Sequence, residues 1–184
     1  MISHFRRLDC YILKRSNYRD ADRLITIFSL QKGKLTLLAK GIRKITSKRA
    51  SSLELFNHVN LLAYKTGGLD LITEVKLLKS YSSFSSNYQK TYIAYQIVEL
   101  IDKLTAEKEP HPELFKLLKT ALNYLNKLNH LDPAQSQAII IRFQKKILNL
   151  LGFGNPDQDD LESLNHYIES LIERQLFTAQ KMKI

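Results

Sequence analysis

The sequence predicts an α+β protein in which a five-stranded barrel of the OB type comes first and an α-helical bundle follows. Up to about residue 80, the apolar residues form short runs separated by turn residues, and beyond that point they recur at helical spacing. The formal charge of +10 also lies before that point, because the first 80 residues hold 16 Lys and Arg against 6 Asp and Glu, and the remaining residues hold 12 of each sign. We therefore expect two domains, residues 1–80 and residues 81–184.

Five runs of strand length, rich in β-branched and aromatic residues, make up the first part. They are residues 8–14, 23–30, 34–40, 58–65 and 69–77. The turn before the third run ends at Gly33, which can adopt the positive φ that a tight hairpin requires, and the glycines 67 and 68 precede the fifth run. In the fifth run a period of two predicts that Val75 and Leu77 are buried and that Ile72 lies on the wet face.

The stretch of residues 41–55 has no strand pattern and leaves room for a loop and a short helix between the third and fourth strands. Five antiparallel strands with an insertion at this place predict an OB-type barrel, which closes the sheet and removes its edges. An SH3-like barrel remains an alternative, because the number of strands does not fix their order.

After Tyr81 the apolar spacing predicts four helices. The first contains residues 93–104, the second starts near Pro112 and contains residues 114–128, and the last two run over about residues 133–151 and 157–175. The third helix is the best delimited, with Asp132 as its N-cap, Pro133 at its first position and Gly152 just past its end. The links are short, so neighbouring helices should pack antiparallel as a bundle.

The composition indicates a cytoplasmic protein without cofactors. Cys10 is the single cysteine, so an internal disulfide is excluded, and its place in a predicted strand indicates a buried residue. No apolar run approaches the ~20 residues of a membrane span, and no signal sequence is evident.

The basic residues of the first part predict a nucleic-acid-binding surface that contacts phosphates and does not recognise base sequence. One set lies in a glycine-containing loop, Lys40, Arg43, Lys44, Lys48 and Arg49. A second set surrounds the first strand and the turn after it, Arg6, Arg7, Lys14, Arg15, Arg19 and Arg23. Tyr11, Tyr18 and Tyr64 are candidates for stacking on bases, although packing in the barrel is the commoner role of such tyrosines.

The sequence offers little that indicates catalysis, and we expect no enzymatic activity and no bound metal. The five histidines lack metal-ligand spacing, and a Walker-type nucleotide loop is missing. The acidic cluster of Asp157, Asp159, Asp160 and Glu162 would suggest a Mg²⁺-dependent nuclease, but it stands at the start of a predicted helix, where capping explains it.

The order of several short motifs resembles the bacterial DNA repair protein family RecO over most of the chain. In the first part these motifs are residues 13–24 (LKRSNYRDADRL), Phe28, residues 32–35 (KGKL), residues 39–44 (AKGIRK) and Ser47. In the second part they are Tyr92, Glu99, Leu100, residues 109–115 (EPHPELF) and residues 150–153 (LLGF).

The resemblance implies an OB domain, a helical domain and the role of a recombination mediator. Members of this family bind single- and double-stranded DNA, anneal complementary strands and work with RecR to load the RecA recombinase onto DNA covered by single-strand-binding protein. They also contact the acidic C-terminal tail of that protein through the helical domain. Many carry a four-cysteine zinc site, but the short region after Gly154 has no cysteine here, so zinc is not expected.

We therefore expect a DNA-annealing repair protein of the cytoplasm, associated with the nucleoid. For an acidic partner peptide the candidates on the third helix are Arg142, Lys145 and Lys146, and a solvated helix face is the alternative for them. An RNA-binding OB adaptor in translation or RNA processing remains the alternative function.

Overall fold

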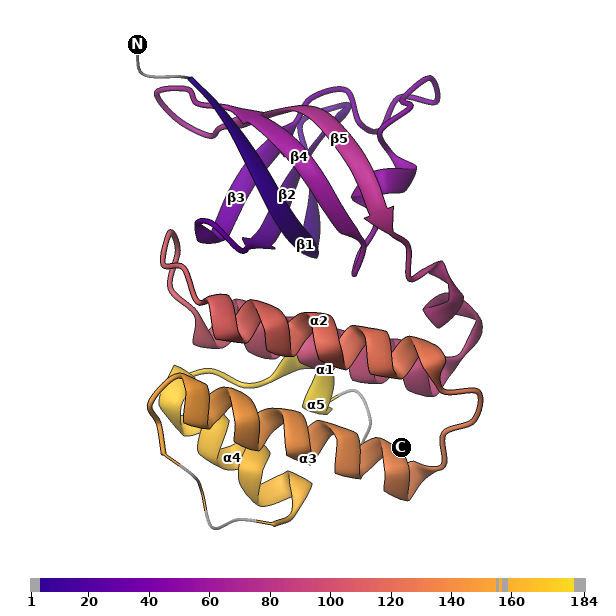
Figure 1. Cartoon of the computed structure of the whole chain (residues 1–184), viewed down its shortest axis with the longest axis vertical. Coiled ribbons are helices and arrows are strands. Elements are labelled where there is room, and N and C mark those ends of the chain that lie inside the picture. Colours follow the sequence, from indigo (N-terminus) through magenta and orange to yellow (C-terminus); the bar gives the residue numbers. More distant parts are fainter. Residues whose placement is uncertain (1–3, 155, 157–158, 181–184) are drawn as a thin grey trace. The chain divides into compact units, whose positions relative to one another are not determined.

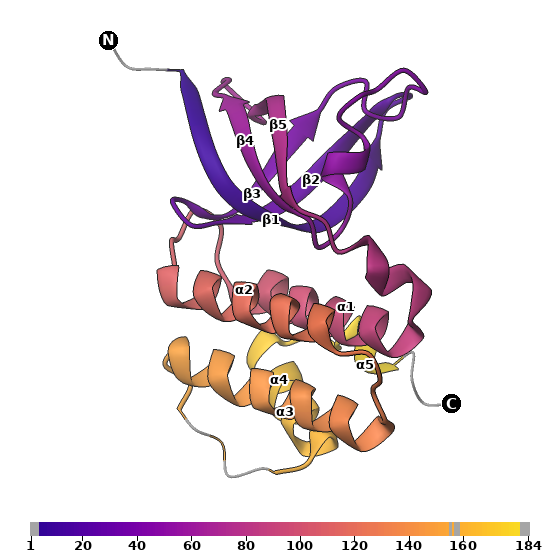
Figure 2. The ribbon, with the colours of Figure 1, turned by 45° about the vertical axis from the view of Figure 1, so that its right-hand side comes forward.

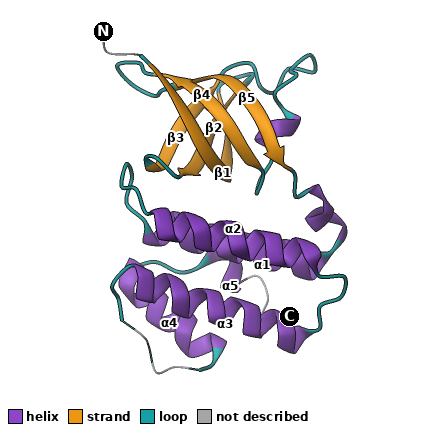
Figure 3. Ribbon diagram, viewed as in Figure 1, coloured by secondary structure: helices purple, strands orange, loops and turns teal. Residues whose placement is uncertain are grey.

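The computed structural model describes residues 4–154, 156 and 159–180. The chain divides into two compact units, one of Met1–Tyr81 with Thr105–Pro112 and one of Ser82–Leu104 with Glu113–Ile184. Strands build the first unit and helices the second, as Figure 3 shows by colour. The predicted α+β class is confirmed.

The first unit is a closed five-stranded barrel (Figure 1). Its strands are β1 (Phe5–Tyr18), β2 (Asp22–Ser29), β3 (Gly33–Ala39), β4 (His58–Tyr64) and β5 (Leu71–Lys79). Around the barrel they follow the order β1-β2-β3-β5-β4, and β4 and β2 both pair antiparallel with β1. β3 and β5 pair in parallel through Leu38 and Leu71. This order is that of an OB-type barrel, so the SH3-like alternative is excluded.

Strand β1 is longer than the sequence predicts, because it serves both neighbours. Its first half pairs with β4 from Phe5 to Tyr11, and its second half pairs with β2 from Cys10 to Tyr18. The register with β2 shifts between Ile12 and Lys14. Figure 2 shows how β1 curves as part of the barrel.

The barrel interior is filled by aliphatic side chains. They are Leu8, Cys10, Ile12, Ile25, Ile27, Leu35, Leu37, Ala39, Ile42, Leu53, Val59, Leu61, Ala63 and Ile72. Ile42 and Leu53 come from the connection between β3 and β4, which includes the short 3₁₀ helix η1 (Ser51–Leu53). Burial of these two side chains fixes the connection to the barrel on both sides of the exposed stretch between them.

The predicted alternation of β5 was right for Val75, which is partly buried against the core, and wrong for Ile72 and Leu77. Ile72 lies in the core with only 3% exposure, whereas Leu77 is 40% exposed. Opposite the step from Leu62 to Ala63 the register skips Thr73, so β5 contains an extra residue there. A bulge of this kind reverses which alternate side chains point inward, and a second register shift follows at the His58 end of β4.

The second unit contains the helices, which begin with the 3₁₀ helix η2 (Ser82–Ser86). The others are α1 (Tyr88–Leu104), α2 (Pro112–Lys127), α3 (Pro133–Leu150), α4 (Leu161–Ile172) and α5 (Phe177–Gln180). The Asp132 side chain accepts a hydrogen bond from the Gln135 amide at 2.7 Å, and Gly152 has φ +81°, so both predicted ends of α3 are confirmed. Among the described residues, none of the helices is long and apolar enough to cross a membrane.

The segment between α1 and α2 packs on the barrel, although it is distant in sequence from the strands. The Lys108 amide donates to the Lys34 carbonyl at 2.9 Å, and Glu107 forms a parallel bridge with Lys34. A Cβ atom on Gly33 would lie 1.8 Å from the Glu109 carbonyl oxygen. Gly33, which has the predicted positive φ of +64°, therefore meets two demands, that of the hairpin and that of this close approach.

Candidate nucleic-acid interface

On the outer surface of β2 and β3, opposite the aliphatic core, two threonines lie side by side. Thr26 pairs with Lys14 of β1 on one side and with Thr36 of β3 on the other, so the three residues form a row across the strands. Lys14 is exposed, and the Thr36 hydroxyl donates to the Glu107 carboxylate at 3.3 Å. The same surface binds oligonucleotides in other OB folds, and here a cation stands at one end of the row and an acid at the other.

At the mouth of the barrel, the turn between β1 and β2 is joined to the connection after β3. The Gly41 amide donates to the Asp22 carboxylate at 2.7 Å, and the Arg43 amide donates to the Ala21 carbonyl at 2.9 Å. The Arg43 guanidinium also reaches the Arg19 carbonyl at 3.4 Å. These bonds bring together the two basic sets that the sequence keeps about twenty residues apart.

Six of the predicted DNA-contacting cations are exposed to solvent on these segments. They are Lys14, Arg19, Lys40, Arg43, Lys44 and Lys48. Between them Ile45 is fully exposed, with a relative accessibility of 105%, while Ile42 on the same connection is buried at 2%. The stretch from Arg43 to Lys48 thus stands out from a fixed base, and its positive charge faces water.

Three other predicted cations are engaged within the barrel. The guanidinium of Arg49 donates to the Ile72 carbonyl at 2.6 Å, to the Lys40 carbonyl at 2.9 Å and to the Thr73 carbonyl at 3.4 Å. Arg15 forms an ion pair with Glu54, and the half-buried Arg23 donates to the Asn17 amide oxygen at 3.3 Å. Two of these arginines, Arg15 and Arg49, hold the connection after β3 against the barrel.

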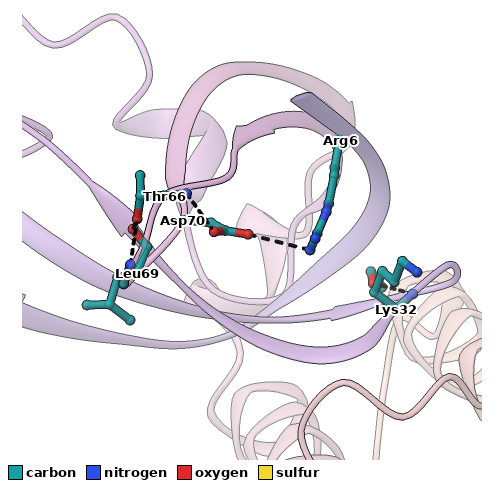
Figure 4. A network of polar contacts seen from close by, with 7 residues as sticks. Arg6, Lys32, Thr66, Leu69 and Asp70 are labelled. Carbon is teal, nitrogen blue, oxygen red and sulfur yellow. Dashed lines mark hydrogen bonds and ion pairs between the residues drawn. The ribbon is translucent and has the colours of Figure 1, made fainter. Parts of the chain in front are cut away.

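Arg6 and Arg7 lie at the start of β1, beside the connection between β4 and β5. Figure 4 shows Arg6 directed at the carboxylate of Asp70, with 3.6 Å between the charged atoms. Asp70 also accepts from the Thr66 amide at 3.2 Å. Arg7 donates to the Asn60 amide oxygen at 3.3 Å. The two arginines therefore belong to a second region of the barrel surface, next to Tyr64.

The three candidate tyrosines have different environments. Tyr11 is fully buried and stacked on His58, with ring centroids 4.5 Å apart, and this burial raises its pKa. Stacking of Tyr11 on a base is therefore excluded in this conformation. Tyr18 is half-buried under the Arg19 guanidinium, and Tyr64 is 37% exposed. Next to Tyr64 lies Phe5, which the sequence reasoning missed because the predicted strand began at residue 8.

The acidic cluster before α4 acts in capping and pairing. The Asp160 carboxylate accepts from the Ser163 amide at 2.8 Å, and this hydrogen bond lowers the pKa of Asp160, so its predicted role as a cap is confirmed. Asp159 forms an ion pair with Lys145. Asp157 lies outside the described residues. Within the described part of the chain, no three His, Cys, Asp or Glu side chains are arranged to hold a metal ion.

On α3, the three cations predicted to bind a partner peptide share one helix face, as their spacing of three and four residues dictates. Arg142 and Lys146 are exposed, and Lys145 is the one that pairs with Asp159. Two charged groups thus remain accessible on this face.

Comparison with known families identifies both parts of the chain. Residues 1–81 match the model of the recombination protein O N-terminal domain, and residues 85–160 match that of the recombination protein O C-terminal domain.

Curated relatives support the same assignment. The DNA repair protein RecO of Desulfitobacterium hafniense (strain DSM 10664 / DCB-2) is 31% identical over 145 residues, which make up 79% of this chain and 51% of the relative. That of Bacillus cytotoxicus is 28% identical over 148 residues, or 80% of this chain and 58% of the relative. That of Syntrophomonas wolfei is 31% identical over 142 residues, or 77% of this chain and 55% of the relative. The chain thus spans about half the length of the curated relatives it matches.

Proposed function

Since the chain belongs to the RecO family, we propose that it acts in DNA repair as a recombination mediator. It binds single- and double-stranded DNA without sequence preference, anneals complementary strands, and helps to load recombinase onto DNA coated with single-strand-binding protein. The observation that carries this proposal is the junction of residues 19–22 with residues 41–43, which gathers exposed cations at one mouth of the barrel.

Phosphate contacts of this kind explain binding to any sequence. A Lys or Arg placed close to a phosphate releases condensed counterions, and this release requires proximity more than a fixed geometry. The exposed stretch from Arg43 to Lys48 meets that requirement, since it projects from a base anchored by Ile42.

Annealing follows from the same contacts. Two strands repel each other through their phosphates, and cations that neutralise one strand reduce that repulsion. Because the contacts are to the backbone, the Watson–Crick edges of the bound strand stay available for pairing. Neither step requires a nucleotide cofactor.

The helical unit supplies partner contacts in this proposal. Arg142 and Lys146 bind the acidic C-terminal tail of single-strand-binding protein, and Lys145 contributes when it leaves Asp159. RecR is the second proposed partner. A protein bound to chromosomal DNA in this way would be found with the nucleoid.

The salt dependence of DNA binding tests the proposed interface. Replacing Arg43, Lys44 and Lys48 with Ala should lower the slope of log K against log salt by about 2 for single strands, since each lost phosphate contact is worth about 0.7. The matched control removes three exposed lysines of the helical unit and so changes the net charge equally. These are Lys103, Lys119 and Lys127.

Equal slopes for the two variants would refute the interface, because the effect would then come from net charge alone. Competition between DNA and RNA oligonucleotides of the same sequence decides the alternative: preference for RNA would argue for an RNA-binding adaptor and against repair.

The mediator role is tested by annealing. Complementary oligonucleotides coated with single-strand-binding protein, one of them fluorescently labelled, should anneal faster with the wild-type chain than without it. The barrel variant should lose most of this acceleration, while the control variant keeps it. An absence of acceleration by the wild-type chain would reject annealing as its activity.

A further inference from the structure

Two aromatic side chains stand exposed next to each other at the start of β1. Phe5 of β1 and Tyr64 of β4 occupy directly opposite register positions, and their ring centroids are 5.0 Å apart at an interplanar angle of 58°. Phe5 is 49% exposed and Tyr64 is 37% exposed. Ala63, next to Tyr64, and Leu8, three residues along β1 from Phe5, point into the core. Because side chains alternate along a strand, the two rings lie on the outer surface of the barrel.

Basic groups border this pair. Arg7 is exposed, and it lies two residues along β1 from Phe5 on the same side of the strand. Lys65 follows Tyr64 directly and is exposed, and its amide donates to the His4 carbonyl at 2.7 Å. The His4 ring lies 6.0 Å from that of Tyr64. Arg6 stands between Phe5 and Arg7 in sequence.

The nearby acids offset only part of this charge. Asp70 pairs with Arg6, and Glu74 is exposed on β5 opposite Leu62. Asp9, two residues beyond Arg7 on the same side of β1, is paired with His58. Asp70 and Glu74 therefore stand against Arg6, Arg7 and Lys65, so the surroundings of the rings keep a positive balance. Exposed rings beside positive charge suit a ligand that is both planar and anionic.

We propose that Phe5 and Tyr64 form a stacking platform for unpaired bases, and that Arg7 and Lys65 hold the adjoining phosphates. This inference rests on the proposed function and deepens it, since it makes the barrel discriminate single strands from duplexes. A base that lies flat on the Phe5 ring is tilted against the Tyr64 ring, as the two rings are against each other. Tilted and edge-to-face contacts between aromatic groups are favourable. Stacking tolerates every base, because every base has a π-face.

Duplex DNA cannot use the platform in the same way. Its bases are already stacked inside the helix, and only their edges reach the grooves. The platform therefore adds affinity for single strands alone, while the cations at the other region of the barrel bind both forms. Such a difference would keep the protein on unpaired DNA until a complementary strand arrives.

The test compares leucine variants that remove a ring but keep an apolar side chain. In the full chain, Phe5→Leu and Tyr64→Leu should each weaken binding to a single-stranded oligonucleotide about 5-fold or more, since a stacked base contributes about that factor or greater. Duplex affinity should change less than about 2-fold, and the salt slope should stay the same because no charge is removed. Tyr64→Phe keeps a ring and should bind like the wild type.

An abasic oligonucleotide of equal length separates stacking from phosphate contact. The wild-type chain should prefer the strand that carries bases, and Tyr64→Leu should lose that preference; 2-aminopurine in the strand should show quenching by the wild type and less by the variant. If both leucine variants keep the preference for bases, the platform is refuted while DNA binding stands. If the wild-type chain binds neither strand, the proposed function fails together with it.

Discussion

Arg49 and Lys48 are adjacent in sequence and both were predicted to contact DNA, but their surroundings in the structure differ. Arg49 donates two well-formed hydrogen bonds, to the carbonyls of Ile72 and Lys40. Lys48 is exposed on the projecting stretch. We predict that Arg49→Ala destabilises the barrel and that Lys48→Ala weakens DNA binding without loss of stability.

The magnitude for Arg49 follows from these bonds. A hydrogen bond to a charged donor contributes about 1.5 to 3 kcal/mol, and taking the lower value for two partly exposed bonds gives a loss of about 3 kcal/mol. The third contact, to Thr73 at 3.4 Å, is too long to add much. For a unit of this size, about 3 kcal/mol lowers the Tm by roughly 12 to 24 °C.

Thermal unfolding by circular dichroism and DNA titrations at several salt concentrations measure the two effects. Lys48→Ala should stay within about 0.5 kcal/mol of the wild type and lower the salt slope for single strands by about 0.7. Arg49→Ala should keep the salt slope while it remains folded. The assignment is wrong if Arg49→Ala melts like the wild type and shows the reduced slope.

Three further predictions concern other parts of the chain. Gly33→Ala should lower the free energy of unfolding by more than about 2 kcal/mol, because the new Cβ meets the Glu109 carbonyl and φ is positive. Amide hydrogen exchange in the segment that links α1 to α2 should become faster, and exchange at the wild-type rate would contradict this. Because the pKa of Asp160 is lowered in the folded state, its carboxylate stabilises the protein at pH values above the ordinary pKa of 3.8, and this stabilisation is lost as pH falls through the folded pKa. The difference in Tm between wild type and Asp160→Ala should therefore narrow with acidification, and a constant difference would refute this. Replacing Arg142 and Lys146 together with Ala should weaken binding of an acidic tail peptide at least about 5-fold by fluorescence anisotropy, and equal affinity of the two proteins would exclude that face.

Local features of the fold were predictable from the sequence, because they depend on neighbours in the chain. The switch from strand to helix spacing, the Gly33 turn and the Asp132 cap each need only a few adjacent residues, and all three are present. The extension of β1 to Phe5 was not predictable in this way. It depends on pairing with β4, whose partner residue Tyr64 is distant in the sequence.

The candidate site shows the same limit. The sequence contains the cations and tyrosines, but it does not show which of them are bound to other groups of the barrel and which are exposed. Tyr11 looked equivalent to Tyr64 as an aromatic residue of a strand, and both rings lie on the side of their strands opposite the aliphatic core, yet Tyr11 is buried against His58 and Tyr64 is exposed. Strand register does not separate the two rings, because both residues alternate with core residues. What covers each ring decides its exposure, and Tyr81, distant in sequence, lies beside Tyr11 with ring centroids 6.4 Å apart.

By itself the sequence determined that a strongly basic strand-rich part precedes a neutral helical part, since charge and apolar period are properties of composition and order. The tertiary structure decided which basic groups face water. It joined the turn at Ala21 to the connection at Arg43 and turned Arg49 inward to backbone carbonyls, because donors and acceptors from distant segments meet only when the barrel closes.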